Sequence, residues 1–65
     1  MPSSVIRTHD YDPARRRLTI TFQSGIRYAY RDVPAEVAAG LDDAASWGEY
    51  FNAAIRDHYG FERLR

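Results

Sequence analysis

The feature that most constrains this chain is a pair of alternating segments, residues 17–22 and 26–31, separated by three residues. In each segment every second residue is apolar, and polar or small residues stand between. This period of two predicts two half-buried β-strands joined by a tight turn. The apolar positions are Leu18, Ile20 and Phe22 in the first segment and Ile26, Tyr28 and Tyr30 in the second.

Two registers are open for this hairpin, depending on how many residues of Gln23–Gly25 form the loop. A two-residue loop would pair Phe22 with Arg27 and place the apolar residues of one strand beside the arginines of the other. A three-residue loop with a left-handed Gly25 instead pairs Phe22 with Ile26. We expect the three-residue loop, because it gathers all six apolar residues, both tyrosines included, on one inward face.

In that register the outward face of the hairpin carries arginines and no acidic residue. Arg17 would lie opposite Arg31, and like charges placed so cost about a few tenths of a kcal/mol. Such a cost indicates that the arginines bind an anionic partner. A second explanation is a solvated face on which the arginine stems cover apolar surface. The candidate phosphate contacts are Arg15, Arg16, Arg17, Arg27 and Arg31, and the candidate base-stacking residues, if exposed, are Tyr28 and Tyr30.

Charge is divided unevenly along a chain whose formal net charge is zero. Residues 1–31 carry six arginines and two aspartates, whereas residues 32–65 carry three arginines and seven acidic residues. A net charge of zero argues against strong general attraction to nucleic acid. The division instead predicts a basic sheet half and an acidic helical half.

The 65 residues and the absence of cysteine predict a single small domain, 1–65, without disulfides. A domain of this size is marginally stable, by about 3–5 kcal/mol, and depends on aromatic packing. No apolar run is long enough to span a bilayer, and the first residues lack the apolar core of a signal peptide. We therefore expect a cytoplasmic protein without membrane association.

The residues before the hairpin predict another strand over 3–11. Its inward residues Ile6, His9 and Tyr11 can share a face only if one residue bulges near Arg7–Thr8. Asp12 and the proline after it then open a turn.

The residues after the hairpin predict two helices. Pro34 starts the first, whose apolar stripe runs from Val33 to Ala44 and which Gly40 weakens. Ser46 and Glu49 form a capping box for the second helix, which is expected to reach about Tyr59 and stop at a left-handed Gly60. Phe61 and Leu64 could then fold back onto the core.

The expected fold is therefore α+β: a three-stranded antiparallel β-meander followed by two helices packed on one face. The third strand would be an edge of the sheet. Edge strands invite pairing with other chains, which keeps a protein-interaction or self-associating module open as an alternative function.

No catalytic, metal or cofactor motif is present, and we expect no enzyme activity, no metal and no cofactor. His9 with Asp10 and Asp12, or Asp57 with His58, could form an acid–base pair or a weak metal site, but neither has a nucleophile or a further ligand at a recognisable spacing. His58 is expected to pack on the apolar side of the second helix. Asn52 and Arg56, one turn apart on the second helix, are the best other polar candidates, although a surface hydrogen-bond pair explains the same spacing.

Several segments together resemble the KTSC domain family, a small module found alone in bacterial and phage proteins and at the C-terminus of some lysyl-tRNA synthetases. The resemblance covers nearly the whole chain, and its most specific part is Tyr-x-Tyr followed by Val-Pro. The matching residues and segments are Ser4, Ile6, Tyr11-Asp12, Leu18–Phe22, Ser24-Gly25, Tyr28–Tyr30, Val33-Pro34, Ala45-Ser46, Gly48, Tyr50–Asn52, Ile55-Arg56 and Tyr59.

The synthetase context of the family implies binding to RNA or another polyanion. Trp47 and Glu49 stand where the family usually has lysines, which weakens any anion site at the start of the second helix. Binding through the outward sheet face is unaffected. An RNA-binding module and a protein-interaction module are the two functional hypotheses.

Overall fold

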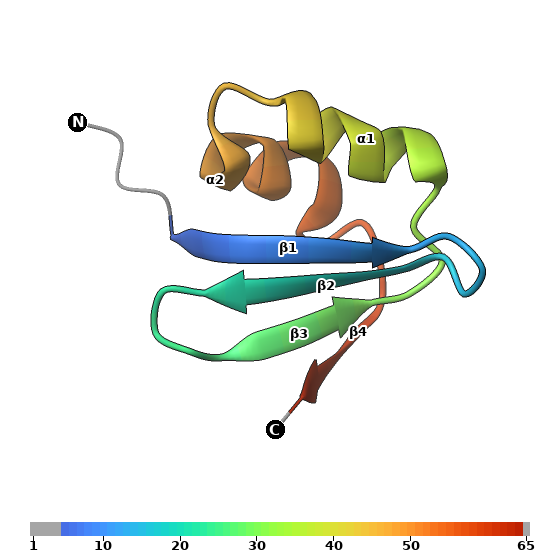
Figure 1. The fold of residues 1–65 in the computed structure, drawn as a ribbon, viewed down its shortest axis with the longest axis horizontal. Helices are drawn as coiled ribbons and strands as arrows, with labels where there is room; N and C mark the ends of the chain where they lie inside the picture. Colours follow the sequence, from blue (N-terminus) through green and yellow to red (C-terminus); the bar gives the residue numbers. More distant parts are fainter. Residues whose placement is uncertain (1–4, 65) are drawn as a thin grey trace.

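The computed structural model describes residues 5–64. Four antiparallel strands form one sheet in the order β1-β2-β3-β4, and a helical layer is inserted between β3 and β4 (Figure 1). The elements are β1 Ile6–Asp12, β2 Arg17–Phe22, β3 Arg27–Tyr30, α1 Ala35–Asp43, α2 Trp47–Tyr50, the π-helix η1 Phe51–Ile55 and β4 Phe61–Leu64. The α+β class is confirmed, but the sheet has a fourth strand, β4, that was not predicted.

The hairpin between β2 and β3 has the three-residue loop. Gly25 is left-handed, with φ of 92°. The backbone N–H of Phe22 donates to the carbonyl of Ile26 at 2.9 Å, and the same pairing continues along both strands. The predicted register is therefore confirmed, and its ladder pairs are Ile20–Tyr28 and Leu18–Tyr30.

The predicted bulge in β1 lies between Ile6 and Thr8, where the register with β2 shifts. Beyond it, His9 pairs with Ile20 and Tyr11 with Leu18, so both side chains lie on the inner face. Residues 3 and 4 of the predicted strand lie outside the described residues.

The prediction that β3 is an edge strand is wrong, because β4 pairs with it over its whole length. In this ladder Tyr30 pairs with Phe61 and Arg27 with Leu64. The sequence of β4 is short and half charged, so it carries no strand signal of its own. Only the return of the chain from the helices places it beside β3. The edges of the described sheet are therefore β1 and β4.

The second helix is shorter than predicted. Ser46 Oγ accepts from the backbone N–H of Glu49 at 3.3 Å, as the capping box requires, but the helix continues as the π-helix η1 and ends at Ile55. Asp57, with φ of 66°, takes the left-handed position that Gly60 was expected to occupy. His58 consequently lies in an exposed turn, and its predicted packing on the apolar helix side is wrong.

The most completely buried part of the core is aliphatic and lies between the helices and strands β1 and β2. Its fully buried side chains are Ile6, Leu18, Ile20, Val33, Leu41 and Ile55. Gly40 has a packing role, because a Cβ there would overlap the ring and hydroxyl of Tyr50. That hydroxyl donates to the Val37 carbonyl at 3.0 Å and joins α2 to α1.

Candidate nucleic-acid interface

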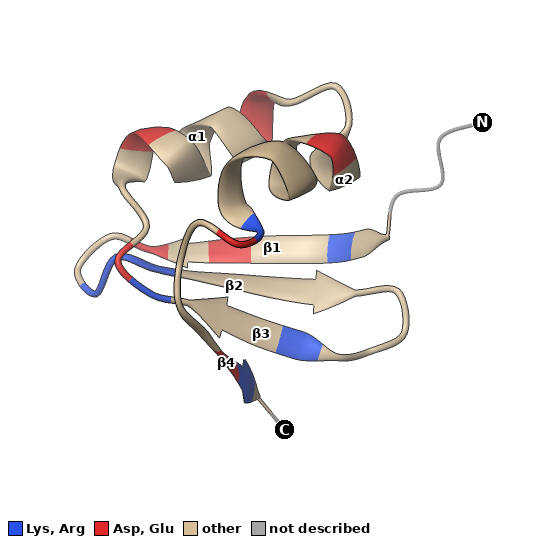
Figure 2. Cartoon of the chain, turned by 180° about the vertical axis from the view of Figure 1, so that it is seen from behind, with Lys and Arg blue, Asp and Glu red and all other residues tan. Residues whose placement is uncertain are grey.

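Four of the predicted arginines gather at one end of the sheet. Arg15 and Arg16 lie in the β1–β2 turn, and Arg17 and Arg31 adjoin the last ladder pair of β2 and β3. The backbone N–H of Val33 donates to the carbonyl of Arg16 at 2.9 Å, which ties the turn to the segment after β3. Figure 2 shows these basic segments side by side. We call Arg15, Arg16, Arg17 and Arg31 the arginine end.

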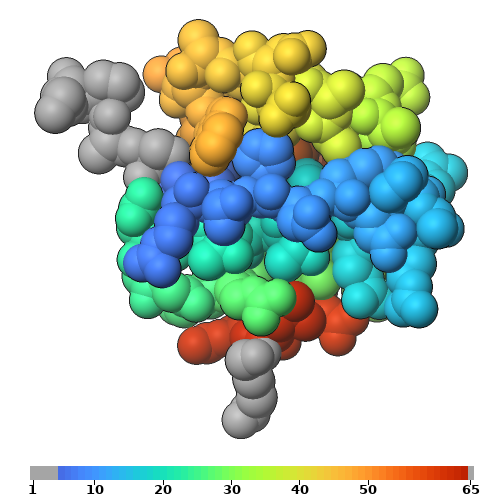
Figure 3. Space-filling model, viewed as in Figure 1, coloured from blue at the N-terminus to red at the C-terminus, as the bar shows by residue number. Residues whose placement is uncertain are grey.

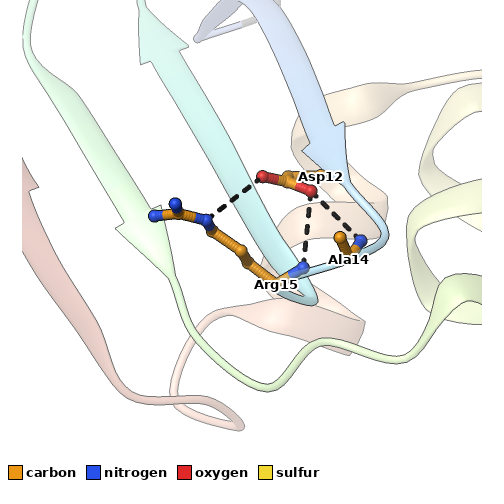
Figure 4. A network of polar contacts seen from close by, with 3 residues as sticks. All are labelled: Asp12, Ala14 and Arg15. Carbon is orange, nitrogen blue, oxygen red and sulfur yellow. Dashed lines mark hydrogen bonds and ion pairs between the residues drawn. The ribbon is translucent and has the colours of Figure 1, made fainter.

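Asp12 shapes this end as a turn residue (Figure 4). Its Oδ1 accepts from the backbone N–H groups of Ala14, at 3.1 Å, and Arg15, at 3.4 Å. Its Oδ2 lies 3.9 Å from Nε of Arg15, whose side chain is 70% exposed. An ion pair so open to water contributes little to stability and leaves the guanidinium able to take another anion.

The outward face of the whole sheet is less basic than that of the hairpin alone. β1 adds Asp12 opposite Arg17, and β4 adds Glu62 opposite Ala29. Arg27 lies at the far end of β3, opposite Leu64, and is therefore separate from the arginine end. The helical layer carries acidic residues on α1 and α2, which gives the molecule the predicted division into a basic sheet and an acidic helical layer (Figure 2).

A second candidate site lies on the inner face of the sheet, between η1 and the β4 edge. The helices lie on the β1 side of the sheet, and β4 lies at the opposite edge (Figures 1 and 3). The space left between η1 and β4 is a partly open hollow of about 490 Å³. Its rings define the aromatic groove: Phe22, Tyr28, Tyr30, Phe51 and Phe61.

The rings of the groove contact one another edge to face, except for a tilted pair. The centroid of Phe61 lies 5.0 Å from that of Tyr28 and 5.3 Å from that of Tyr30. Phe61 is 52% exposed, Tyr28 is half-buried and Tyr30 is only 4% exposed. Both tyrosines point inward, as predicted, but Tyr28 and Phe61 remain accessible from the aromatic groove.

A polar wall faces these rings from the end of η1. Arg56 Nη1 donates to Asn52 Oδ1 at 3.3 Å, and Asp57 follows in the turn. π-helices are rare and are frequently found at functional sites, and η1 is the element that carries Asn52 and ends beside Arg56. The wall thus presents both donors and acceptors to the groove.

The two tyrosine hydroxyls complete the polar surface of the groove. Burial raises the pKa of Tyr30, the nearby Tyr28 raises it further, and Asp57 adds to the effect while Arg56 opposes it. No hydrogen bond among residues 5–64 involves either hydroxyl, yet neither oxygen is buried. By contrast, Tyr11 donates to the Val33 carbonyl at 2.7 Å. The hydroxyls of Tyr28 and Tyr30 are therefore open to a ligand.

The structure joins two sets of predicted residues that are separate in the sequence. Tyr28 and Tyr30 lie in the same groove as Asn52 and Arg56. The sequence predicted that Phe61 could fold back onto the core, but not the strand that brings its ring into this groove. Asp57 was considered only together with His58, because the helix was expected to continue past that position.

The opposite side of the molecule has another hollow, of about 410 Å³, between β1 and α1. His9 lines it, with Nε2 3.9 Å from Asp42 Oδ1 and its ring edge-on to Trp47. No group of three metal-ligating side chains occurs among residues 5–64. No helix in that part of the chain is long and apolar enough to cross a membrane.

Comparison with known sequences gives one matching family. The sequence profile of the KTSC domain matches residues 2–59, which include everything described except the segment that contains β4. An uncharacterized protein of Stutzerimonas stutzeri is 38% identical over 65 residues, covering 98% of this chain and 92% of that protein.

Larger relatives contain the same region. The lysine–tRNA ligase of Nostoc punctiforme is 43% identical over 61 residues, which is 94% of this chain. The chain spans only 11% of the length of that ligase. Among solved structures, a KTSC domain protein from Yersinia pestis superposes with a TM-score of 0.90 at 30% identity, covering 100% of this chain and 92% of that one.

Proposed function

This chain belongs to the KTSC domain family, and we propose that it is a non-catalytic module that binds single-stranded RNA. The observation that carries the proposal is the arginine end, where four arginines from two separate segments lie at one end of the sheet. Arginine guanidinium groups bind phosphate oxygens with two parallel hydrogen bonds. The occurrence of the domain within lysine–tRNA ligases, which act on an RNA, supports the same proposal.

The surrounding charges set the character of this binding. Asp12 and Asp32 lie among the arginines, and the chain has no net charge. Phosphate contacts of this kind hold the backbone and carry no sequence information. We therefore expect weak, salt-sensitive binding that tolerates most sequences.

The experiment compares two double variants with the same loss of charge. R15A/R31A removes two exposed arginines of the arginine end, and R7A/R63A removes two exposed arginines outside it. We expect R15A/R31A to bind a single-stranded oligoribonucleotide more weakly. It should also have a smaller salt dependence, by about 1.4 in the slope of log affinity against log salt, because about 0.7 is lost per phosphate contact.

The R7A/R63A variant should retain the slope of the wild type. Equal effects of the two double variants would mean that only net charge matters and would remove the arginine end as a site. Fluorescence anisotropy between about 50 and 200 mM salt measures both quantities.

One observation favours a second function, the binding of a protein or of another copy of this chain. β4 is an edge strand whose residue Phe61 is 52% exposed, and exposed edge strands can pair with another chain. Sedimentation at low and high salt tests this alternative. A salt-labile oligomer favours self-association, and a monomer under both conditions rejects it.

A further inference from the structure

We infer that the aromatic groove receives one unstacked nucleobase of the RNA strand that the arginine end holds. The inference rests on the proposed function and adds what that function does not specify, a pocket for a base. The hollow of about 490 Å³ falls within the range of small-molecule sites, about 300–1,000 Å³.

The two walls of the groove match the two parts of a nucleobase. A base has an apolar flat surface, which stacks on aromatic rings, and a polar edge with hydrogen-bond donors and acceptors. Phe61 and Tyr28 offer accessible rings, whereas the opposite wall offers the Asn52 amide and the Arg56 guanidinium. A purely apolar ligand would form no hydrogen bonds with this polar wall.

The charges of the polar wall favour the base over the phosphate. Arg56 and Asp57 are adjacent and opposite in charge, so this wall has no net attraction for an anion. The Tyr30 hydroxyl is protonated at neutral pH, as any tyrosine hydroxyl is, and can donate a hydrogen bond. Neutral, directional partners of this kind suit a base edge.

The groove also adjoins the arginine end. A Cβ on Gly60 would lie 3.1 Å from Nη2 of Arg31, so this guanidinium packs against the backbone that leads into Phe61. The N–H of Arg31 donates to the Gly60 carbonyl at 2.8 Å. One nucleotide can therefore place its phosphate near Arg31 and its base near Phe61.

The test uses two oligomers of equal length, a single-stranded oligoribonucleotide and its abasic counterpart, which keeps the ribose and the phosphates. Asn52 is the sole asparagine of the chain, so selective isotope labelling of asparagine makes its side-chain amide an unambiguous pair of NMR signals. We expect the oligoribonucleotide to shift the Asn52 amide and the Nε–H signals of Arg15 and Arg31. The abasic oligomer should shift the arginine signals alone.

Variants of the exposed ring provide a second measurement. F61L should lower affinity for the oligoribonucleotide by about 5- to 20-fold, within the range for loss of one base stack, and leave the abasic oligomer unaffected. F61W keeps a ring and should bind within about twofold of the wild type. If F61L does not fold, N52A, at an exposed position, should lower affinity for the base-containing oligomer only.

The outcomes separate the two proposals. Arginine signals that shift while the Asn52 amide stays still, or an Asn52 shift that the abasic oligomer also produces, would overturn the groove inference and leave the arginine end standing. No shift with either oligomer would overturn both.

Discussion

The inner face of the sheet is aliphatic and closed beneath the helices, but aromatic and open toward β4. In the closed half, Leu18, Ile20 and Leu41 have no exposed surface. In the open half, Phe61 is 52% exposed and Tyr28 is half-buried, although both lie on the same face. The same core is thus sealed from solvent under the helices and open to solvent near β4.

The difference shows how a small domain combines stability with a binding surface. Aliphatic side chains stabilise in proportion to the area removed from water, so they are most effective where the helices cover them completely. Aromatic rings also interact with one another through edge-to-face contacts, worth about 0.5–1.5 kcal/mol per pair. A ring cluster can therefore stay ordered while one side of it remains accessible.

The sharpest test of this comparison pairs L41A with F61A. Leu41 is fully buried, so its truncation should cost about 2–5 kcal/mol, which is enough to unfold most of a domain stable by about 3–5 kcal/mol. Phe61 is half exposed, and F61A should cost only about 1–2 kcal/mol. Urea unfolding followed by circular dichroism measures both, and a larger loss for F61A would break the comparison.

A second test concerns how tightly the closed half is packed. Alanine is a better helix former than glycine by about 1 kcal/mol, so propensity alone predicts that G40A stabilises α1. The overlap with Tyr50 predicts the reverse, a loss of about 1–3 kcal/mol.

The control for this test removes the obstructing ring. In a Y50L background, alanine at position 40 should become neutral or stabilising by up to about 1 kcal/mol. Thermal or urea unfolding of the four proteins gives the coupling between the two sites. Simple additivity would show that Gly40 and Tyr50 do not compete for space.

The smallest effect is expected from the hydroxyl of Tyr30 in the open half. Its pKa is raised by burial and by Tyr28. As pH rises, the hydroxyl therefore ionises in the unfolded chain before it ionises in the folded protein. The stability that depends on the neutral hydroxyl is complete below about pH 10 and is lost as pH rises through the folded-state pKa. The free energy of unfolding should therefore fall more steeply above about pH 10 for the wild type than for Y30F.

Urea unfolding at a series of pH values between about 8 and 11 measures this difference. Near neutral pH the two proteins should have similar pH dependence. Parallel curves over the whole range would show that Tyr30 ionises equally in both states.

Much of the fold could be predicted because its signals are local. The loop at Gly25, the bulge between Ile6 and Thr8 and the cap at Ser46 each follow from residues within one turn or one strand pair. The end of the second helix could not be predicted, because Asp57 adopts a left-handed conformation that sequence reasoning assigns first to glycine.

The candidate site shows the same division. The arginines and the polar pair Asn52–Arg56 were identifiable as residue types at suitable spacings. Their grouping was not predictable, because the segment after β3 meets the β1–β2 turn through the backbone hydrogen bond from Val33 to Arg16, and Tyr28 and Arg56 line the same groove. Contacts between segments far apart in the chain have no signal in either segment.

The sequence by itself determined the hairpin, its register and the inward direction of both tyrosines, since a period of two and one glycine decide which side chains share a face. The tertiary structure alone decided that these tyrosines are not sealed in. The helices cover the β1 side of the sheet, and β4 returns to the opposite edge, so the aromatic part of the core stays open. The physical reason is that strand alternation is a local property, whereas coverage depends on where distant elements pack.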